Sequence, residues 1–424
     1  MRKRGGAICR LKRMNVPEDR ISRISALRPA NRRGTVSPPG NMSRSNFDEL
    51  LRLLNGTIRK NDLGRHTIVR RWFDEPGAGK VERRALKLLL PDMPESACDP
   101  GQWLFLDTET TGLAGGTGTY AFLIGIGWWE SGRFIVEQYF MRDHSEEPSL
   151  LYGLLDRMKR RPVLVTYNGK SFDWPLLQTR YRMTRVGKIR EPEAHLDLLY
   201  PARRIWRLRL KSVALTQLET HVLRFNRGRD IPSETIPQLY FDFLRGAGPE
   251  GIAEVFHHNQ MDLCGLAFLA QHILKILEDP ESSGCDPTEL FGISRLLQQR
   301  GDPECAERIY GKAVDGGLPE SAEQIAFREL AIAAKRRRDF QLSNANWEKL
   351  LGDTTEGFRA YEQLAIYYEH HANKPQRAAH LSREALVRLQ EVYRAGRIQS
   401  PQYIRLYKRF RHRLDRLSKK ISDI

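Results

Sequence analysis

The sequence predicts an α/β domain with a mixed sheet flanked by helices, followed by an all-α region built from helical repeats. Short β-rich runs alternate with helical patterns between about residues 46 and 280, which is typical of α/β domains. Pro, Gly and Ser then cluster at residues 277–287, which indicates a domain boundary. All later patterns are helical. These observations predict two domains flanked by basic tails.

The composition limits the class of protein and of partner. The 424 residues carry a formal net charge of +17, which favours a polyanionic partner such as nucleic acid or an anionic membrane surface. The longest apolar run, residues 120–129, is half the length that crosses a bilayer, and no apolar signal core follows the first basic residues. The five cysteines include no C-x-x-C pair, so neither a zinc module nor a disulfide framework is indicated. We expect a cytoplasmic protein without a membrane partner.

The N-terminal segment, residues 1–45, is rich in Arg and Lys and has no sustained apolar periodicity. It is expected to be a disordered basic arm. Two alternatives stay open: an organellar transit peptide, or a true start at Met14 or Met42.

The first domain is expected to span residues 46–280, with its core at about 100–275. Its pattern predicts three consecutive strands, then a helix, a strand and a second helix that is entered through a turn. These elements are expected at residues 103–110, 119–129, 132–141, 149–158, 161–169 and 171–181.

The second domain is expected at residues 288–390, where three helical segments align with a period of about 35 residues. The alignment places Tyr310, Trp347 and Ser382 in one register, and Ala306, Ser343 and Ala378 in another. This resembles tetratricopeptide repeats, which would offer a surface to a protein partner; an ordinary helical bundle is the alternative. Residues 391–424 read as a basic amphipathic helix, with eight Lys or Arg between Arg405 and Lys420.

The chemistry starts with the stretch WLFLDTETTGL at residues 103–113. Asp107 and Glu109 are two residues apart in a predicted strand, so their side chains point to the same side. Two neighbouring carboxylates repel and are costly to desolvate unless a cation lies between them. Ligands that are all oxygen favour Mg²⁺ or Mn²⁺ over zinc.

Two further segments supply carboxylates. YNGKSFD runs from a strand through a turn into a helix and ends at Asp173. In the helical segment HHNQMD, His258 and Asp262 are four residues apart and therefore share one helix face.

The set DTETTGL, YNGKSFD and HHNQMD, in this order, resembles the three exonuclease motifs of the DEDD superfamily of 3′ to 5′ exonucleases. HLDLLYPARRIWR and DIPSETIPQLYFDFLRG resemble the bacterial YprB-type ribonuclease H-like proteins. The resemblance covers about residues 100–275 and implies a ribonuclease H-like fold, with which the predicted order of strands and helices agrees. It also implies a metal-dependent exonuclease.

Carried over by position, the resemblance makes Asp107, Glu109, Asp173 and Asp262 the metal ligands of two Mg²⁺ or Mn²⁺ ions. The general base is His258 or His257, since the two subclasses of the superfamily place it four or five residues before the last Asp. The spacing in HNQMD favours His258.

Substrate contacts are expected from residues after the first motif, in the turn of the second motif and in a basic stretch at 203–211. These candidates are Thr110, Thr111, Leu113, Asn168, Trp174, Arg203, Arg204 and Arg207. For each the alternative is structural: an ordinary turn, core packing for Trp174, and a solvated face for the arginines. Asp197 is expected to orient its neighbours and not to touch metal.

The predicted function is therefore a nuclease, with 3′ to 5′ exonuclease action on a single-stranded end of DNA or RNA. Two alternatives stay open. One is a catalytically silent scaffold that binds nucleic acid and docks a protein through its repeats, and the other is a structure-specific endonuclease.

Overall fold

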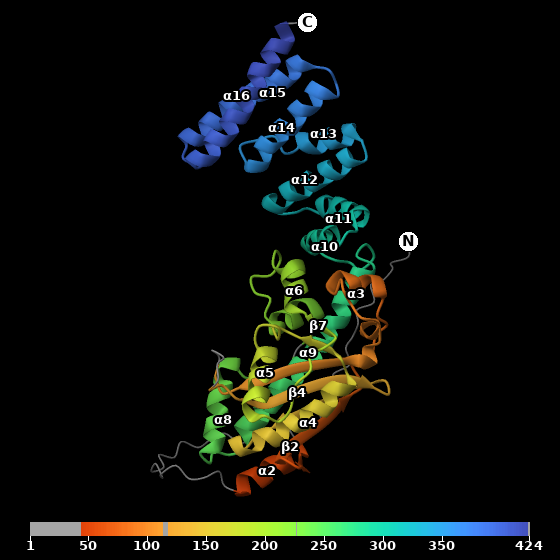
Figure 1. Ribbon diagram of the computed structural model, residues 1–424, viewed down its shortest axis with the longest axis vertical. Helices are drawn as coiled ribbons and strands as arrows, with labels where there is room; N and C mark the ends of the chain where they lie inside the picture. The colour runs from red at the N-terminus through yellow and green to blue at the C-terminus, as the bar shows by residue number, and fades with distance from the viewer. Residues whose placement is uncertain (1–43, 113–117, 226, 423–424) are drawn as a thin grey trace, which may run out of the picture. The chain divides into compact units, whose positions relative to one another are not determined.

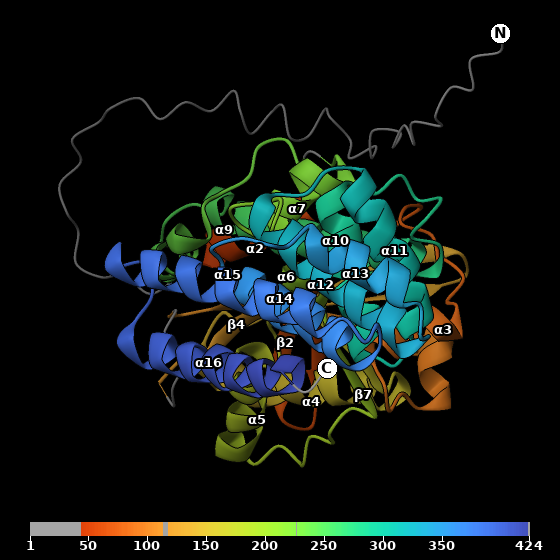
Figure 2. The same cartoon turned by 90° about the horizontal axis from the view of Figure 1, so that it is seen from above.

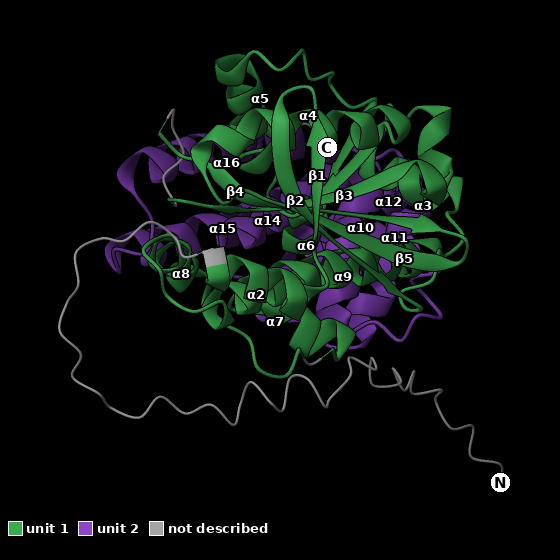
Figure 3. Cartoon of the chain, turned by 90° about the horizontal axis from the view of Figure 1, so that it is seen from below, with its two compact units in different colours: residues 1–203, 210–278 green, residues 204–209, 279–424 purple. Residues whose placement is uncertain are grey.

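The structure is a computed structural model that describes residues 44–112, 118–225 and 227–422. The chain divides into two compact units, which Figure 3 colours separately: residues 1–203 with 210–278, and residues 204–209 with 279–424. We call them the α/β unit and the helical unit. The predicted basic arm, except its last two residues, and Leu113 lie outside the described residues.

The α/β unit is built on one mixed sheet of seven strands in the order β1-β2-β5-β4-β3-β6-β7. The first five strands in this order pair antiparallel, whereas β6 and β7 run parallel to β3. The strands are β1 (Thr57–Asn61), β2 (Gly64–Phe73), β3 (Trp103–Thr110), β4 (Ala121–Glu130), β5 (Arg133–Phe140), β6 (Val163–Thr166) and β7 (Ala194–Asp197). The predicted fold class, a mixed sheet flanked by helices and followed by a helical region, is confirmed.

Helices cover both faces of the sheet (Figure 3), with α4 and α5 on one face and α2, α8 and α9 on the other. This explains why all residues of β4 except the last are buried and form an almost continuous apolar run. The helices of this unit are α2 (Arg44–Leu54), α3 (Arg83–Leu89), α4 (Glu147–Arg160), α5 (Asp173–Thr184), the first part of α6 (Leu199–Trp206), α7 (Leu215–Leu218), α8 (Ile236–Leu244) and α9 (Glu250–Glu278).

Helix α9 carries both apolar side chains of the core and the polar residues of the HHNQMD segment. It packs across β3, β4 and β5, and it buries apolar side chains such as Phe256 and Leu263 along its 29 residues. Within the described part of the chain, no helix combines the length and the apolar character that a bilayer crossing requires.

The helical unit contains antiparallel helices joined by short turns (Figure 1). They are α10 (Pro287–Gln299), α11 (Pro303–Asp315), α12 (Glu320–Arg336), α13 (Phe340–Glu348), α14 (Thr355–His370), α15 (Pro375–Arg394) and α16 (Ser400–Ser422). Asp286 caps α10 through a reciprocal pair with Glu289. Tyr310, Trp347 and Ser382 are all buried. Their equivalence as tetratricopeptide-like repeats remains a prediction.

Residues 204–209 join the helical unit through α10. Trp206 Nε1 donates a hydrogen bond of 2.8 Å to Glu289 Oε1. A Cβ atom at Gly292 would overlap the carbonyl oxygen of Arg204, so only glycine permits this approach.

Candidate active site

The site begins on β3, in the middle of the sheet. Asp107 and Glu109 project to the face that α9 covers, and the buried side chains of Leu104 and Leu106 precede them on the strand. The pKa values of Asp107 and Glu109 both lie well above the usual carboxyl range, first because burial penalises the charged form and then because other carboxylates lie close by. Asp262 and Asp173 contribute to both upward shifts.

A buried amide connects Asp107 to the neighbouring strands. Asn259 Nδ2 donates to Asp107 Oδ2 at 2.7 Å, while Asn259 Oδ1 accepts from Gln138 Nε2 at 2.8 Å. Gln138 and Asp107 both pair with Gly125 on β4, and a Cβ atom at Gly125 would overlap the Asn259 side chain. The missing side chain on β4 therefore allows α9 to reach Asp107.

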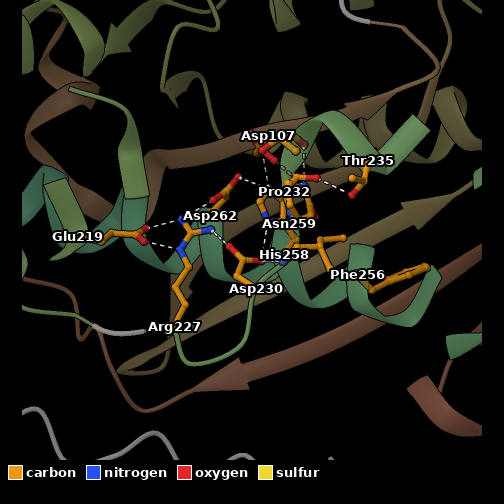
Figure 4. Close-up of polar contacts among 12 residues, drawn as sticks. Asp107, Glu219, Arg227, Asp230, Pro232, Thr235, Phe256, His258, Asn259 and Asp262 are labelled. Atoms are coloured by element: carbon orange, nitrogen blue, oxygen red, sulfur yellow. Dashed lines mark hydrogen bonds and ion pairs between the residues drawn. The ribbon is translucent and has the colours of Figure 1, made fainter. Parts of the chain in front are cut away.

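One turn of α9 brings His258 and Asp262 to the same face. His258 Nε2 lies 3.5 Å from Asp262 Oδ2, and His258 Nδ1 lies 2.7 Å from Asp230 Oδ1 (Figure 4). The candidate ligand atoms of Glu109, His258 and Asp262 all lie within 4.8 Å of one another. The structure thus brings together three of the predicted site residues from β3 and α9.

The pKa values of the two histidines shift in opposite directions. Burial lowers the pKa of His258, but the hydrogen bond to Asp230 and the charges of Asp262 and Asp107 outweigh burial and raise this pKa above its usual value. Burial lowers the pKa of His257, whose side chain makes no hydrogen bond or ion pair with the described residues. His258, not His257, therefore faces the carboxylates.

Arg227, in the segment before α8, and the carboxylates around it are residues of the site that the sequence analysis did not predict. Arg227 forms ion pairs with Glu219, Asp230 and Asp262, and the Asp230 pair measures 3.1 Å (Figure 4). The pKa of Asp230 falls to about 2: burial alone would raise it, but His258 and Arg227 outweigh burial. Burial raises the pKa of Glu219 to about 7 despite its pairing with Arg227. Arg227 thus holds Asp262 and Asp230 on either side of one guanidinium.

Asp173 enters from the opposite face, as the first residue of α5. Thr108 Oγ1 donates to Asp173 Oδ1 at 2.5 Å, and burial raises the pKa of Asp173 to about 6. In the turn before α5, Asn168 has a left-handed φ of 66°. Asp197 accepts hydrogen bonds from the backbone N–H groups of Asn168 and Lys170, so Asp197 positions this turn.

The structure places the remaining candidates as follows. Thr110 Oγ1 donates to the carbonyl of Gly112, and Thr111 exchanges hydrogen bonds with the backbone of Tyr120. Trp174 is buried, and its indole N–H donates to Glu191. Asn168 is exposed.

The three predicted arginines lie on α6. Arg203 and Arg207 are exposed, whereas Arg204 is half-buried and its pKa is lowered, first by burial and then by Arg295 and Arg300. Arg203, the one of the three that belongs to the α/β unit, forms no ion pair with the described carboxylates of the site.

The donor set fits a divalent cation. Four carboxylates are buried or half-buried in one region, and for Asp107, Glu109 and Asp173 burial outweighs every group that would stabilise the charge. A hard divalent cation bound by oxygen ligands would supply the missing positive charge. Arg227 supplies it only to Asp262 among these four.

Comparisons with known proteins agree with this architecture. Residues 104–274 match the family model described as the RNase_H superfamily. The chain is 30% identical to the protein "Uncharacterized protein YprB" of Bacillus subtilis over 285 residues, which are 66% of this chain and 68% of that protein.

Among solved structures, the family B DNA polymerase of the archaeon Pyrobaculum calidifontis aligns with a TM-score of 0.34 and 18% identity, over 51% of this chain and 29% of that chain. The chain therefore spans less than a third of that polymerase. The match to YprB and the match to the superfamily model together show that the chain belongs to the YprB family of RNase_H superfamily proteins.

Proposed function

We propose that this protein is a metal-dependent nuclease that hydrolyses phosphodiester bonds, acting as a 3′ to 5′ exonuclease on single-stranded ends. One observation carries the proposal: buried carboxylates with raised pKa values gather around a histidine that a further carboxylate orients. Membership of the RNase_H superfamily supports nuclease activity and the use of divalent cations. The polarity and the single-stranded substrate rest on the resemblance of the three motifs, and a cytoplasmic location is part of the same proposal.

In this proposal Asp107, Glu109, Asp173 and Asp262 hold two Mg²⁺ or Mn²⁺ ions. When bound, such ions would orient the phosphate and neutralise the charge that develops on its oxygens. The raised pKa values of Asp107 and Glu109 fit this role, because a carboxylate that lacks a cation in the free protein gains most when one binds.

His258 would serve as the general base. Because Nδ1 lies against the Asp230 carboxylate, Nδ1 carries the proton of the neutral ring and Nε2 keeps its lone pair, directed toward Asp262. Water would add to phosphorus and pass a proton to Nε2, while the bond from phosphorus to the 3′ oxygen breaks and this oxygen takes up a proton from solvent. The products would be a nucleoside 5′-monophosphate and a shortened strand with a free 3′ hydroxyl.

Arg227 favours the alternative of a silent scaffold, because it already satisfies Asp262 without metal. We expect Arg227 to keep its pairs with Glu219 and Asp230 when Asp262 turns to a metal, since those two carboxylates flank the same guanidinium.

The test is a time course on 5′-labelled single-stranded DNA and RNA of equal sequence, with Mg²⁺ or Mn²⁺. We expect a ladder that shortens from the 3′ end, present in the wild type and absent in Asp107→Asn. Asp62→Asn, in the exposed turn between β1 and β2, is the matched control and should retain full activity. Internal cuts would select the endonuclease alternative. Binding of both polymers without cleavage under any metal would select the scaffold.

A further inference from the structure

We propose that the outer face of α16 binds the sugar-phosphate backbone of single-stranded nucleic acid. Helices α15 and α16 lie side by side (Figures 1 and 2). Four basic side chains of α16 form what we call the outer row, at spacings of three, four and seven residues that keep them on one helix face. The outer row is Arg405, Lys408, His412 and Lys419.

The opposite face of α16 is already used inside the helical unit. Phe410, Leu414 and Leu417 are buried against the neighbouring helices. Basic residues beside them pair with carboxylates of α14: Arg413 and Arg416 reach Glu369 at 2.8 and 2.6 Å. The inner cations of α16 are therefore neutralised within the fold.

The outer row has no such partner. All four side chains are exposed, and none forms an ion pair or a hydrogen bond with the described residues of the chain. Asp415, the one carboxylate on this helix, lies on the same face between His412 and Lys419, but it pairs with Arg411 at 3.3 Å and with no member of the outer row. From Arg405 to Lys419 the row extends about 21 Å at 1.5 Å per residue. Arg405, Lys408 and Lys419 thus carry three positive charges on one face that no carboxylate of the described chain pairs with.

The burial of the apolar face of α16 favours nucleic acid over an anionic membrane as its partner. A basic amphipathic helix that lies on a membrane must insert its apolar face among the lipid chains. Phe410, Leu414 and Leu417 are unavailable for insertion because they form part of the core of the unit. A phosphodiester backbone needs only the exposed cations, so it fits α16 better than a lipid surface does.

This inference rests on the proposed function, since it assigns the helical unit the task of holding the polymer that the α/β unit would cut. Binding is therefore measured without metal, where no hydrolysis occurs. The two proposals can then fail separately. If the protein does not cleave nucleic acid, binding by α16 can still be measured. If α16 does not bind nucleic acid, cleavage of short substrates can still be measured.

The experiment uses the full chain and a fluorescent single strand of about 30 nucleotides in EDTA, followed by anisotropy over a range of salt concentrations. The triple variant Arg405→Glu, Lys408→Glu and Lys419→Glu should weaken binding at least about tenfold. Loss of three phosphate contacts should also reduce the slope of log K against log salt by about 2. The matched control reverses three exposed cations of the α/β unit, through Arg59→Glu, Lys60→Glu and Lys159→Glu, and should bind like the wild type.

A milder triple variant, Arg405→Gln, Lys408→Gln and Lys419→Gln, guards against misfolding and should show about half of the change in salt slope or more. Equal binding by wild type and both α16 variants would overturn the proposal. So would an equal loss in the α/β control, because net charge alone would then explain it. Vesicles containing phosphatidylserine form the last arm: sedimentation with vesicles that depends on the outer row, with unchanged oligonucleotide binding, would also overturn it.

Discussion

The α/β unit and the helical unit treat buried carboxylates in opposite ways. In the helical unit, Glu369 is only 3% exposed, yet Arg416 and Arg413 outweigh the cost of burial and lower its pKa. In the α/β unit, Glu109 is 9% exposed and Asp107 is half-buried, but nearby carboxylates reinforce burial and their pKa values rise. Arginines of the fold stabilise the charge of Glu369, whereas no described arginine or lysine pairs with Asp107 or Glu109, which is what the proposed metal site requires.

This contrast teaches how a structural carboxylate differs from a ligand. Arginines at fixed positions make Glu369 part of a closed network that joins α14 to α16. Asp107 instead receives one neutral amide, from Asn259, which orients the carboxylate without cancelling its charge. An orienting donor without a counter-charge suits a group that binds a cation in function.

The largest expected effect comes from removing a β3 charge. Asp107→Asn should reduce hydrolysis by about three orders of magnitude, because several kcal/mol of transition-state stabilisation are lost. The same variant should raise the unfolding temperature of the metal-free protein, since it relieves repulsion and keeps an oxygen to accept from Asn259. Initial rates and thermal melts in EDTA test both. An active variant, or one with a lower melting temperature, would contradict the contrast.

The second largest effect is expected at His258, where substitution should reduce the rate of hydrolysis far more than at His257. His258→Ala should lower the rate about a hundredfold or more, as expected for loss of a general base. His257→Ala should change it less than about tenfold, because its side chain does not face the carboxylates. Single-turnover rates with saturating Mn²⁺ compare the two variants, and a weaker His257→Ala enzyme would reverse the assignment.

The helical unit gives the opposite response to charge removal. Glu369→Gln should lower the free energy of unfolding by about 2 kcal/mol, because it leaves the largely buried Arg413 without its closest partner. Cleavage of short substrates should not change. Urea unfolding followed by circular dichroism measures the loss. Glu391→Gln, an exposed carboxylate of α15, is the control and should leave stability within about 0.5 kcal/mol.

The smallest effect concerns pH. Because the pKa values of Asp107, Glu109 and Asp173 are raised in the folded protein, the stability of the metal-free protein should fall as pH rises above about 4, through about 6 for Asp173 and at higher pH for Asp107 and Glu109. Metal binds the deprotonated carboxylates, so its stabilisation should grow over the same range. Melting temperatures with and without Mn²⁺ should therefore differ by a few degrees more at about pH 7.5 than at about pH 5. An equal difference at both pH values would argue against carboxylate ligands.

Much of the fold was predictable because its signals are local. Apolar runs at residues 103–110 and 119–129 predicted two buried strands, and the spacing of His258 and Asp262 predicted their shared helix face. The connection between β3 and α9 was harder to predict. Asn259 stands inside the HHNQMD motif, but only the structure shows that it bonds both Gln138 and Asp107.

Arg227 and Asp230 lay beyond prediction for a different reason. Arg227 belongs to RFNRGRD, a segment without periodicity, and Asp230 also opens DIPSETIPQLYFDFLRG, whose resemblance to YprB-type proteins assigned it no role. Their role follows from tertiary contacts with Glu219, His258 and Asp262. A buried partner such as Glu219, which is 1% exposed, leaves no mark in the sequence.

Gly125 carries a consequence that extends beyond packing. Because Asp262 and Asn259 stand on the same helix, the depth at which α9 settles onto β4 fixes both the orientation of Asp107 and its distance from Asp262. The lack of a side chain at Gly125 thus sets the distance between β4 and α9, and with it the geometry of the site. A Gly125→Ala substitution would therefore increase the distance between the proposed ligands on β3 and those on α9, although none of the ligand residues would be replaced.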